Sequence, residues 1–263
     1  MDISLAGRTA WVTGGSEGIG RAIARQLAEC GARVALTARD AADLEDAVGE
    51  LERSGAEAMA AAADVSSPDE MKRAVQQIVD RWGGLDTVVA NAGTNGTWAP
   101  IDELTPDEWS QTIAVNLTGS FLTIHAAVPH LKKSDGASVT LISSVNGTRV
   151  FSNEGASAYA SSKAGQLALG KMAALELAQF KIRVNVVCPG AFDTGIHEKT
   201  DKQDLDKIDT PIEFPEGSVP LTQGDMGDPS QIGKLVAFLS SDAAGHITGT
   251  PVWIDGAESL LQG

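Results

Sequence analysis

Short apolar runs alternate with helical patterns along the whole chain, and this alternation constrains the fold more than any other feature. The runs are almost continuously apolar, as in a sheet that helices cover on both faces. The predicted strands are 9–14, 33–38, 85–91, 137–144, 183–189 and 251–255, and the alanine-rich run 57–64 suits a strand or a helix. This order predicts an α/β fold, a doubly wound parallel (Rossmann) sheet of about seven strands with helices on both faces.

Three segments predict where helices begin. SPDE at 67–70, TPDE at 105–108 and DPSQ at 228–231 each supply a capping side chain, a proline at the first helical position and Glu or Gln at the third. In a capping box, these first and last side chains each accept a backbone N–H at the helix start. We find no linker, repeat or low-complexity tract, so we expect a single domain over residues 1–263.

Residues 195–227 interrupt the regular alternation. The segment is polar, contains Pro211, Pro215 and Pro220, and is longer than an ordinary connection. Long loops of this kind are often lids or binding loops, so we expect a substrate-binding loop here. His197 in this loop is either a ligand contact or, more simply, a surface histidine. Further candidates for lining the pocket are Asn146, Arg149, Phe151, Phe192 and Phe214.

The composition disfavours several classes of function. A formal net charge of −15 argues against nucleic acids and anionic membranes as partners, because their phosphates would be repelled. Cys30 and Cys188 lie far apart in apolar surroundings, which predicts buried free thiols and a reducing compartment. The first residues lack a signal-peptide pattern, and no apolar run reaches the ~18 residues that a membrane span needs. We therefore expect a soluble, cytoplasmic protein without a metal site.

The segment TGGSEGIG, residues 13–20, follows the first predicted strand and opens the first predicted helix. Its glycines at 14, 18 and 20 allow a tight turn and a close approach of the backbone to a pyrophosphate. The helix that follows adds free N–H groups and the positive end of its dipole. At a first strand–helix junction, this pattern predicts a dinucleotide-binding loop.

Several motifs occur in an order that resembles the short-chain dehydrogenase/reductase family, in particular its 3-oxoacyl-reductase-like members. They are TGGSEGIG, Asp64–Val65, Asn91–Gly93, Asn116, Ser143–Ser144, YASSK at 159–163 and PGAFDT at 189–194. The resemblance runs along almost the whole chain and implies a nicotinamide cofactor. The residues that it implies for the cofactor site are Gly14, Ser16, Glu17, Gly18, Ile19, Gly20, Asp64, Val65, Asn91, Ala92, Gly93, Tyr159, Lys163, Pro189, Gly190, Phe192 and Thr194.

Tyr159 is the only tyrosine in the chain, and Lys163 follows it by one helical turn. On a helix the two side chains share a face, with their Cβ atoms about 5–6 Å apart. A phenol has a pKa of about 10 and is a poor proton-transfer group at neutral pH. An ammonium about 5 Å away would stabilise the phenolate by about 3.3 kcal/mol, or roughly 2.4 pKa units. We therefore predict that Lys163 makes Tyr159 a usable general acid and base.

Two more residues complete the predicted catalytic site. The resemblance implies that a serine binds the substrate oxygen, and Ser144 at the end of a predicted strand is the candidate, while Ser143 should face the other way. The segment between Ser144 and Tyr159 is longer than is usual in the family, which suggests an altered substrate pocket. Asn116 either satisfies a local backbone group or, as the resemblance implies, holds a water that links Lys163 to solvent.

The end of the second predicted strand, ALTARD at 35–40, bears on the choice of cofactor. NAD-preferring members of the family carry an aspartate where this chain has Ala38. Arg39 follows, and an arginine can pair with the 2′-phosphate of NADP. Glu17 and Asp40 bring negative charge that argues the other way. On balance we expect Arg39 to favour NADP(H) over NAD(H).

The sequence thus predicts an enzyme that transfers a hydride between NAD(P)(H) and a secondary alcohol or ketone of a small molecule. Two alternatives stay open. One is a non-redox epimerase or lyase on the same fold, and the other is a non-catalytic dinucleotide-binding regulator. The resemblance also implies a homotetramer, formed through the helices that carry Asn116 and Tyr159 and through the C-terminal strand.

Overall fold

The computed structural model of the chain describes residues 3–195, 200–208 and 219–262, and within these a seven-stranded parallel sheet forms the centre of the fold. The strand order is β3-β2-β1-β4-β6-β7-β9. The strands are β1 (Thr9–Thr13), β2 (Arg33–Thr37), β3 (Ala58–Ala60), β4 (Thr87–Ala90), β6 (Ser138–Ile142), β7 (Arg183–Pro189) and β9 (Pro251–Ile254). Each lies within a run that the sequence marked as a possible strand, so the predicted sheet is confirmed. The ambiguous alanine-rich run forms the edge strand β3.

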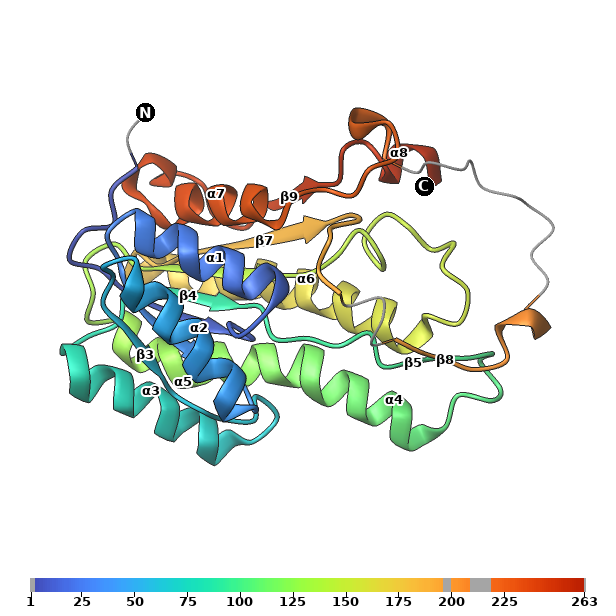
Figure 1. Cartoon of the computed structure of the whole chain (residues 1–263), viewed down its shortest axis with the longest axis horizontal. Coiled ribbons are helices and arrows are strands. Elements are labelled where there is room, and N and C mark those ends of the chain that lie inside the picture. Colours follow the sequence, from blue (N-terminus) through green and yellow to red (C-terminus); the bar gives the residue numbers. More distant parts are fainter. Residues whose placement is uncertain (1–2, 196–199, 209–218, 263) are drawn as a thin grey trace.

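Helices pack on both faces of this sheet (Figure 1). One face carries α1 (Gly18–Glu29), α2 (Ala41–Arg53) and α7 (Pro229–Ser240), and the other carries α3 (Pro68–Trp82), α5 (Gly119–Leu131) and α6 (Ser157–Leu177). Their buried side chains form two apolar clusters, with Leu27 and Ile232 in one and Met71 and Leu177 in the other. The doubly wound arrangement that the apolar runs predicted is therefore confirmed.

Shorter helical elements complete the described chain. They are α4 (Pro106–Ile113), the π-helical turn η1 (Ala114–Thr118), the 3₁₀ turns η2 (Ala178–Phe180), η3 (Leu205–Lys207), η4 (Pro220–Thr222) and η5 (Asp242–Ala244), and α8 (Ser259–Gln262). α4, η1 and α5 run on from one another as a continuous helix. Cys30 and Cys188 are both free, as expected, but only Cys188 is buried, and Cys30 is partly exposed.

The helix starts follow the predicted capping pattern only in part. Thr105 and Glu108 form the full capping box at α4, and α7 begins with an aspartate cap. Ser67 makes no side-chain cap on α3. The Glu70 carboxylate instead accepts the backbone N–H of Asp64, in the turn before the helix. The capping box is therefore confirmed at α4 and wrong at α3, where a competing backbone donor takes the glutamate.

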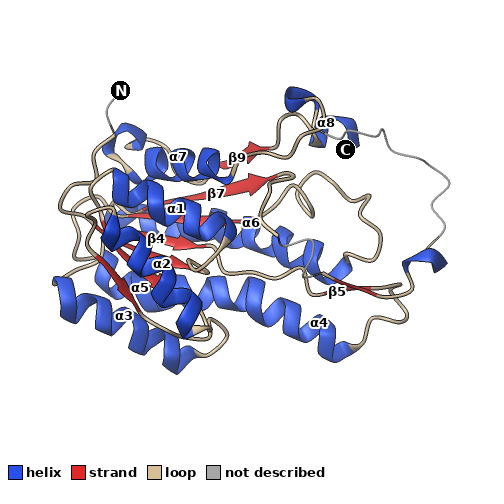
Figure 2. Cartoon of the chain, in the orientation of Figure 1, coloured by secondary structure: helices blue, strands red, loops and turns tan. Residues whose placement is uncertain are grey.

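The strand order reverses beside β1, which has β2 on one side and β4 on the other. In an open parallel sheet, the loops that leave the carboxyl ends of strands at such a point diverge and leave a crevice between them. Figure 2 shows the strands enclosed by helices, with the long loops gathered beyond the tips of the arrows. The fold therefore places a binding crevice where the loops after β1 and β4 part.

The described part of the predicted loop 195–227 has more structure than the sequence suggested. Strand β8 (Asp201–Lys202) pairs in parallel with β5 (Thr97–Trp98) and forms a separate two-stranded sheet. Lys207 forms ion pairs with Glu103 and Asp204. These contacts tie the loop to the segment before α4. The pocket candidates His197 and Phe214 lie outside the described residues.

One helix in the described residues, Pro106–Leu131, is long and apolar enough to cross a membrane, contrary to the expectation from the sequence. It comprises α4, η1 and α5, and it contacts β4, α3 and α6. Two of its large side chains, Leu122 and Leu131, belong to the apolar cluster on that face of the sheet. Packing in the core therefore accounts for much of the apolar character of this helix.

Candidate active site

A cavity of about 740 Å³ opens at the carboxyl edge of the sheet, where the strand order reverses. The predicted site residues that line it are Gly14, Ser16, Glu17, Gly18, Ile19, Gly20, Arg39, Asp64, Val65, Asn91, Ala92, Gly93, Ser144, Asn146, Tyr159, Lys163, Pro189, Gly190, Phe192 and Thr194. Of the predicted catalytic and cofactor-binding residues, Asn116 alone lies outside the wall. The fold thus brings segments that are far apart in sequence into one cavity.

The glycine loop between β1 and α1 is shaped by close backbone contacts. Gly14 and Gly18 have φ angles of +64° and +50°, which glycine adopts without strain. A Cβ atom on Gly14 would lie 2.8 Å from the Cα of Ala92, and one on Gly20 would overlap the carbonyl oxygen of Gly14. α1 begins at Gly18, so its free N–H groups lie at the edge of the cavity. This cradle suits the pyrophosphate of a dinucleotide.

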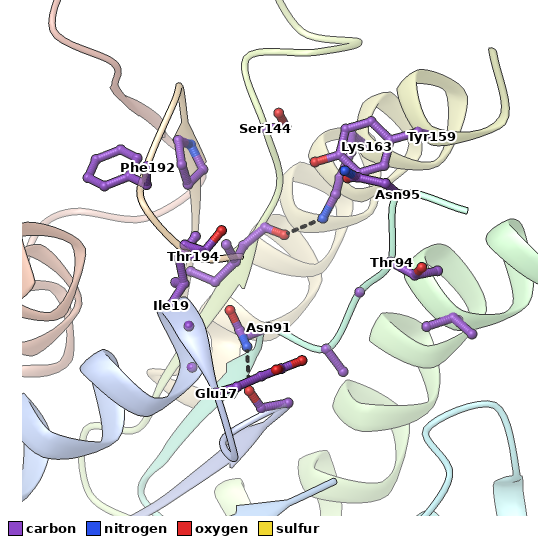
Figure 3. A pocket seen from close by; sticks show the side chains of 18 of the residues that line it. Glu17, Ile19, Asn91, Thr94, Asn95, Ser144, Tyr159, Lys163, Phe192 and Thr194 are labelled. Atoms are coloured by element: carbon purple, nitrogen blue, oxygen red, sulfur yellow. Dashed lines mark hydrogen bonds between the residues drawn. The ribbon is translucent and has the colours of Figure 1, made fainter. Parts of the chain in front are cut away.

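Asn91 joins the loops that follow β1 and β4. Its side-chain Nδ2 donates to the carbonyl oxygens of Thr13, at 3.0 Å, and Gly14, at 3.1 Å. Its backbone N–H donates to the hydroxyl of Thr13 at 3.1 Å. Figure 3 shows the side chain of Asn91 beneath the cavity, between the two loops. Asn91 therefore fixes the width of the crevice at the point where the strand order reverses.

The charged residues after β2 and β3 differ in how many hydrogen bonds within the chain already engage them. Asp40 caps α2, because its carboxylate accepts two backbone N–H groups of that helix. Asp64 accepts hydrogen bonds from the hydroxyl and the backbone N–H of Ser66, and these bonds, with a smaller contribution from the charge of Arg39, lower the pKa of Asp64. Arg39 itself is exposed at the cavity wall. It can therefore meet an anionic group at the rim of the cavity.

Tyr159 and Lys163 share one face of α6, as the spacing predicted. The lysine Nζ lies 5.5 Å from the centre of the phenol ring. Lys163 is buried, and its Nζ donates to the carbonyl oxygen of Ile142 at the end of β6, at 3.1 Å (Figure 3). The Tyr159 ring also contacts the Trp98 ring, with centroids 6.4 Å apart. Both side chains are thus held firmly in the cavity wall.

The predicted direction of the tyrosine pKa is wrong for this structure. Burial raises the pKa of Tyr159, and the nearby Ser144 hydroxyl opposes that rise. Burial also lowers the pKa of Lys163, to about 8. The attraction between phenolate and ammonium predicted a lower pKa, but removing both charges from water has a cost that acts in the opposite direction. Without further positive charge beside it, Tyr159 is therefore a proton donor at neutral pH.

The two serines after β6 have different partners. The Ser144 Oγ accepts the backbone N–H of Asn146 at 3.1 Å, and the same hydroxyl lies near the Tyr159 phenol and opposes the rise in its pKa. The Ser143 hydroxyl donates to the carbonyl oxygen of Lys163 at 2.8 Å. Ser143 therefore anchors α6 against the sheet, while Ser144 meets the phenol. The expectation that the two side chains face different ways agrees with these contacts.

Asn116 lies in the π-helical turn η1 and is fully buried. Its amide oxygen accepts the backbone N–H of Thr94 at 2.8 Å, and its Nδ2 donates to the carbonyl oxygen of Thr94 and the hydroxyl of Ser162, both at 2.9 Å. Its backbone carbonyl accepts from the side chains of Ser120 and Gln166. Asn116 therefore ties the loop after β4 to α6, as the structural interpretation of a buried polar residue expects.

The longer segment between Ser144 and Tyr159 folds back on itself. Asn146 and Val150 form an isolated β-bridge, and the Asn153 amide donates to the Asn146 side chain at 2.9 Å. Both asparagines line the cavity. Arg149 and Phe151 do not, contrary to expectation: Arg149 stacks over the Trp253 ring, and Phe151 is 75% exposed. The extra length therefore adds amide groups to the cavity.

Sequence reasoning missed several residues of the cavity wall. They are Asp43, Ala63, Thr94, Asn95, Trp98, Val115, Ile142, Val145, Asn153, Ala191 and Glu258. Thr94 and Asn95 directly follow the Asn91–Gly93 motif, so extending the loop by two residues would have found them. Glu258 carries no such signal, because only the folding of the C-terminal segment brings it to the cavity.

The buried lysine makes a prediction about stability and pH. The folded Lys163 has a pKa of about 8, against 10.5 for the free side chain, so between these values the unfolded chain binds more protons. Stability from this group therefore rises with pH across that window. From about pH 7 to about pH 9.5, wild type should gain about 2 kcal/mol in free energy of unfolding relative to Lys163→Met. Urea unfolding measures this, and parallel pH curves for the two proteins would contradict it.

Comparisons with known proteins agree with this geometry. The family model described as enoyl-(acyl carrier protein) reductase matches residues 14–257. The chain is 37% identical to a tropinone reductase homologue of Arabidopsis thaliana, over 98% of this chain and 92% of that protein. It is similar to the structure of a 3-ketoacyl-ACP reductase from Sinorhizobium meliloti, with 46% identity, a TM-score of 0.92 and coverage of 96% and 99% of the two chains. A short chain dehydrogenase from Burkholderia cenocepacia in complex with NADP is 33% identical, with a TM-score of 0.84 and coverage of 97% and 98%.

The cavity and the comparisons lead to the same conclusion. The crowded glycine loop at the start of α1 fits a dinucleotide, because a side chain at Gly14 or Gly20 would fill the space that the backbone needs. The relatives are reductases and dehydrogenases, and they do not favour a non-redox enzyme or a regulator. The chain belongs to the short-chain dehydrogenase/reductase family and is an NAD(P)-dependent oxidoreductase that acts on a small molecule.

Proposed function

We propose that the protein transfers a hydride between NADP(H) and a secondary alcohol or ketone, with Ser144, Tyr159 and Lys163 as its catalytic residues. One observation carries this proposal: Ser144 and Tyr159 line the same cavity that the glycine loop borders, and the Ser144 hydroxyl lies near enough to the phenol to influence its pKa. A carbonyl oxygen bound there would meet two O–H donors at once. This is the arrangement that ketone reduction needs, because negative charge develops on that oxygen.

In reduction, the bound nicotinamide would supply the hydride to the carbonyl carbon. Tyr159 donates its phenolic proton to the carbonyl oxygen, and Ser144 donates a hydrogen bond that orients the same oxygen. The raised pKa of Tyr159 keeps this proton in place at neutral pH. Oxidation of an alcohol is the reverse, with Tyr159 as the base. Lys163 and the positive charge of an oxidised nicotinamide would then favour the phenolate.

The cofactor contacts are proposed residue by residue. Asp64 and Val65 flank the adenine, while Asn91, Ala92 and Gly93 line the middle of the cofactor. Pro189, Gly190, Phe192 and Thr194 hold the nicotinamide, and Lys163 binds its ribose. Their common place in the wall of one cavity supports these roles.

We propose Asn116 as a positioning residue, because its amide holds the loop after β4 against α6. A water relay through Asn116 to Lys163 stays a prediction. Some support for it comes from Gly93, since a Cβ atom there would lie 3.3 Å from the Asn116 oxygen and 3.5 Å from the Lys163 Nζ. The two polar atoms thus approach the same small region.

The preference for NADP(H) is proposed on the charges at the end of β2. Arg39 is exposed at the cavity wall, where its guanidinium can meet a 2′-phosphate. Asp40, which argued for NAD(H), is engaged as the cap of α2. The opposing argument from the sequence is therefore weaker than the charges alone suggested.

A panel of ketones, followed by nicotinamide absorbance with NADPH and with NADH, tests the proposed function. We expect oxidation of the cofactor with at least one ketone and a higher kcat/KM with NADPH. Arg39→Ala should lower kcat/KM for NADPH about tenfold and leave NADH almost unaffected, because the phosphate pair is lost. Arg53→Ala, an exposed arginine at the end of α2, is the matched control. A clear preference of the wild type for NADH would defeat the Arg39 argument.

We further propose a cytoplasmic homotetramer in which each chain is one domain. Phe121 on α5 and Met172 and Leu175 on α6 are 47%, 69% and 79% exposed, on the two helices through which the family resemblance implied assembly. Large apolar side chains on neighbouring helices are typical of a surface that another chain covers. Light scattering after size-exclusion chromatography gives the mass, and a monomer would contradict the proposal.

A further inference from the structure

Glu258 reaches the cavity from the C-terminal segment between β9 and α8. Its Oε2 accepts the backbone N–H of Ala191 at 2.8 Å. A Cβ atom on Gly190 would overlap this carboxylate, so the glycine there is what admits it. The side chain is half-buried. The loop after β7 and a carboxylate from the end of the chain therefore form one piece of the cavity wall.

The charge of Glu258 is poorly compensated. No cation forms an ion pair with it in the part of the chain that the structure describes. Its neighbour Asp255 is also negative, and burial together with this charge raises the pKa of Glu258. The Asp255 carboxylate is itself satisfied by Ser259 and Ala257. Glu258 has one backbone donor and spare acceptor capacity, which a ligand donor could fill.

Backbone contacts join the loop that touches Glu258 to the segment that carries Ser144. The N–H of Val145, next to Ser144, donates to the carbonyl oxygen of Pro189 at 2.9 Å. Gly190, which touches Glu258, follows Pro189 directly. The loop residue that touches Glu258 therefore directly follows the one that binds the backbone beside Ser144.

The cavity offers little positive charge to balance an anionic substrate. Among its described lining residues, the cations are Arg39, at the far end beside β2, and Lys163, whose Nζ is turned to the Ile142 carbonyl. Near Ser144 the wall presents the side-chain amides of Asn146 and Asn153. A carboxylate bound here would face Glu258 without a counter-charge.

We propose that Glu258 is a specificity residue, which accepts a hydrogen bond from a hydroxyl or ammonium group of the substrate and disfavours substrates that carry a carboxylate. This rests on the proposed function, because it requires the substrate carbonyl at Ser144 and Tyr159. The class of substrate is thus a neutral or cationic ketone with a donor group a few bonds from its carbonyl. Glu258 attracts a substrate that carries a hydroxyl or ammonium group and repels one that carries a carboxylate.

Three cyclohexanones with different 4-substituents test this: hydroxyl, methoxy and carboxylate. Wild type should prefer the hydroxyl compound to the carboxylate by at least about tenfold in kcat/KM, and to the methoxy compound by a smaller factor. Glu258→Gln keeps an acceptor for Ala191 and removes the charge. In this variant, the ratio of kcat/KM for the hydroxyl compound to that for the carboxylate should fall about tenfold. The ratio of the hydroxyl compound to the methoxy compound should stay nearly unchanged.

Asp255→Asn is the matched control, since it removes an equal charge three residues away that does not line the cavity. If Asp255→Asn lowers the hydroxyl-to-carboxylate ratio of kcat/KM as much as Glu258→Gln does, the proposal is overturned, because overall charge would then explain the effect. If Glu258 binds the nicotinamide amide instead, Glu258→Gln weakens NADPH binding equally with all three ketones and keeps their ratios, which also overturns it. Thermal unfolding checks that each variant is folded.

Calorimetry with the NADP⁺-bound enzyme measures the affinities of the three ketones without turnover. The expected order of binding in the absence of any reduction would support the role of Glu258 and count against the proposed reaction. Reduction of all three ketones with equal kcat/KM would do the opposite. Neither binding nor reduction of any of the three would count against both.

Discussion

Replacing Tyr159 with phenylalanine is expected to lower kcat for ketone reduction by at least about 100-fold, because the carbonyl oxygen loses its proton donor. The ring stays, with its contact to Trp98, so the cavity wall should keep its shape. Affinity for the cofactor should therefore change little. Steady-state absorbance assays measure the first effect, and titration of NADPH fluorescence measures the second.

The outcome for Tyr159→Phe separates a catalytic role from a structural one. Unchanged thermal unfolding with lost turnover supports proton donation. Retention of more than a few per cent of wild-type turnover would refute the assignment. The pH dependence adds a second check: because burial raises the pKa of Tyr159, reduction should persist through neutral pH, while oxidation should rise as the pH approaches the pKa.

Gly20→Ala is expected to abolish dinucleotide binding and to destabilise the fold by at least about 3 kcal/mol. The added methyl would overlap the carbonyl oxygen of Gly14 and crowd the Asn91 side chain. The backbone of the loop cannot move aside freely, because Gly14 is also pressed against Ala92. Fluorescence titration with NADPH and urea unfolding measure the two effects.

Gly84→Ala provides the control for this steric argument. A Cβ atom on Gly84 would have no heavy atom within 4 Å, so the same chemical change should cost little there. Normal NADPH binding by Gly20→Ala would contradict the contacts described for the glycine loop. Equal destabilisation by both variants would show that the loss of glycine itself, and not the overlap, is responsible.

The sequence predicted most of the fold because its signals are local. A strand covered on both faces is almost continuously apolar, as Val184–Cys188 is apart from Asn185, and a tight loop before a helix has to use glycine, as at Gly14. The spacing of Tyr159 and Lys163 is also local, since any helix brings such a pair onto one face. These features need no knowledge of distant contacts.

Features that depend on distant contacts were missed or predicted wrongly. The pKa of Tyr159 depends on how deeply α6 is buried against the sheet, which the sequence does not reveal. The Glu70 carboxylate accepts the backbone N–H of Asp64 instead of capping α3, and the sequence does not reveal the turn that brings this N–H within reach. Glu258 comes to the cavity only because the C-terminal segment passes the loop after β7. In each case a second segment decides the outcome.

The cavity holds the only tyrosine of the chain, so the ionisation of an active-site residue can be followed by ultraviolet absorbance. Ionisation of a phenol changes its ultraviolet absorbance, whereas the indole rings of the five tryptophans do not titrate near neutral pH. A spectrophotometric titration of the unlabelled protein would therefore report the charge state of Tyr159 alone. Repeating the titration with the oxidised and with the reduced cofactor would measure how the charge of the nicotinamide ring changes the pKa of Tyr159.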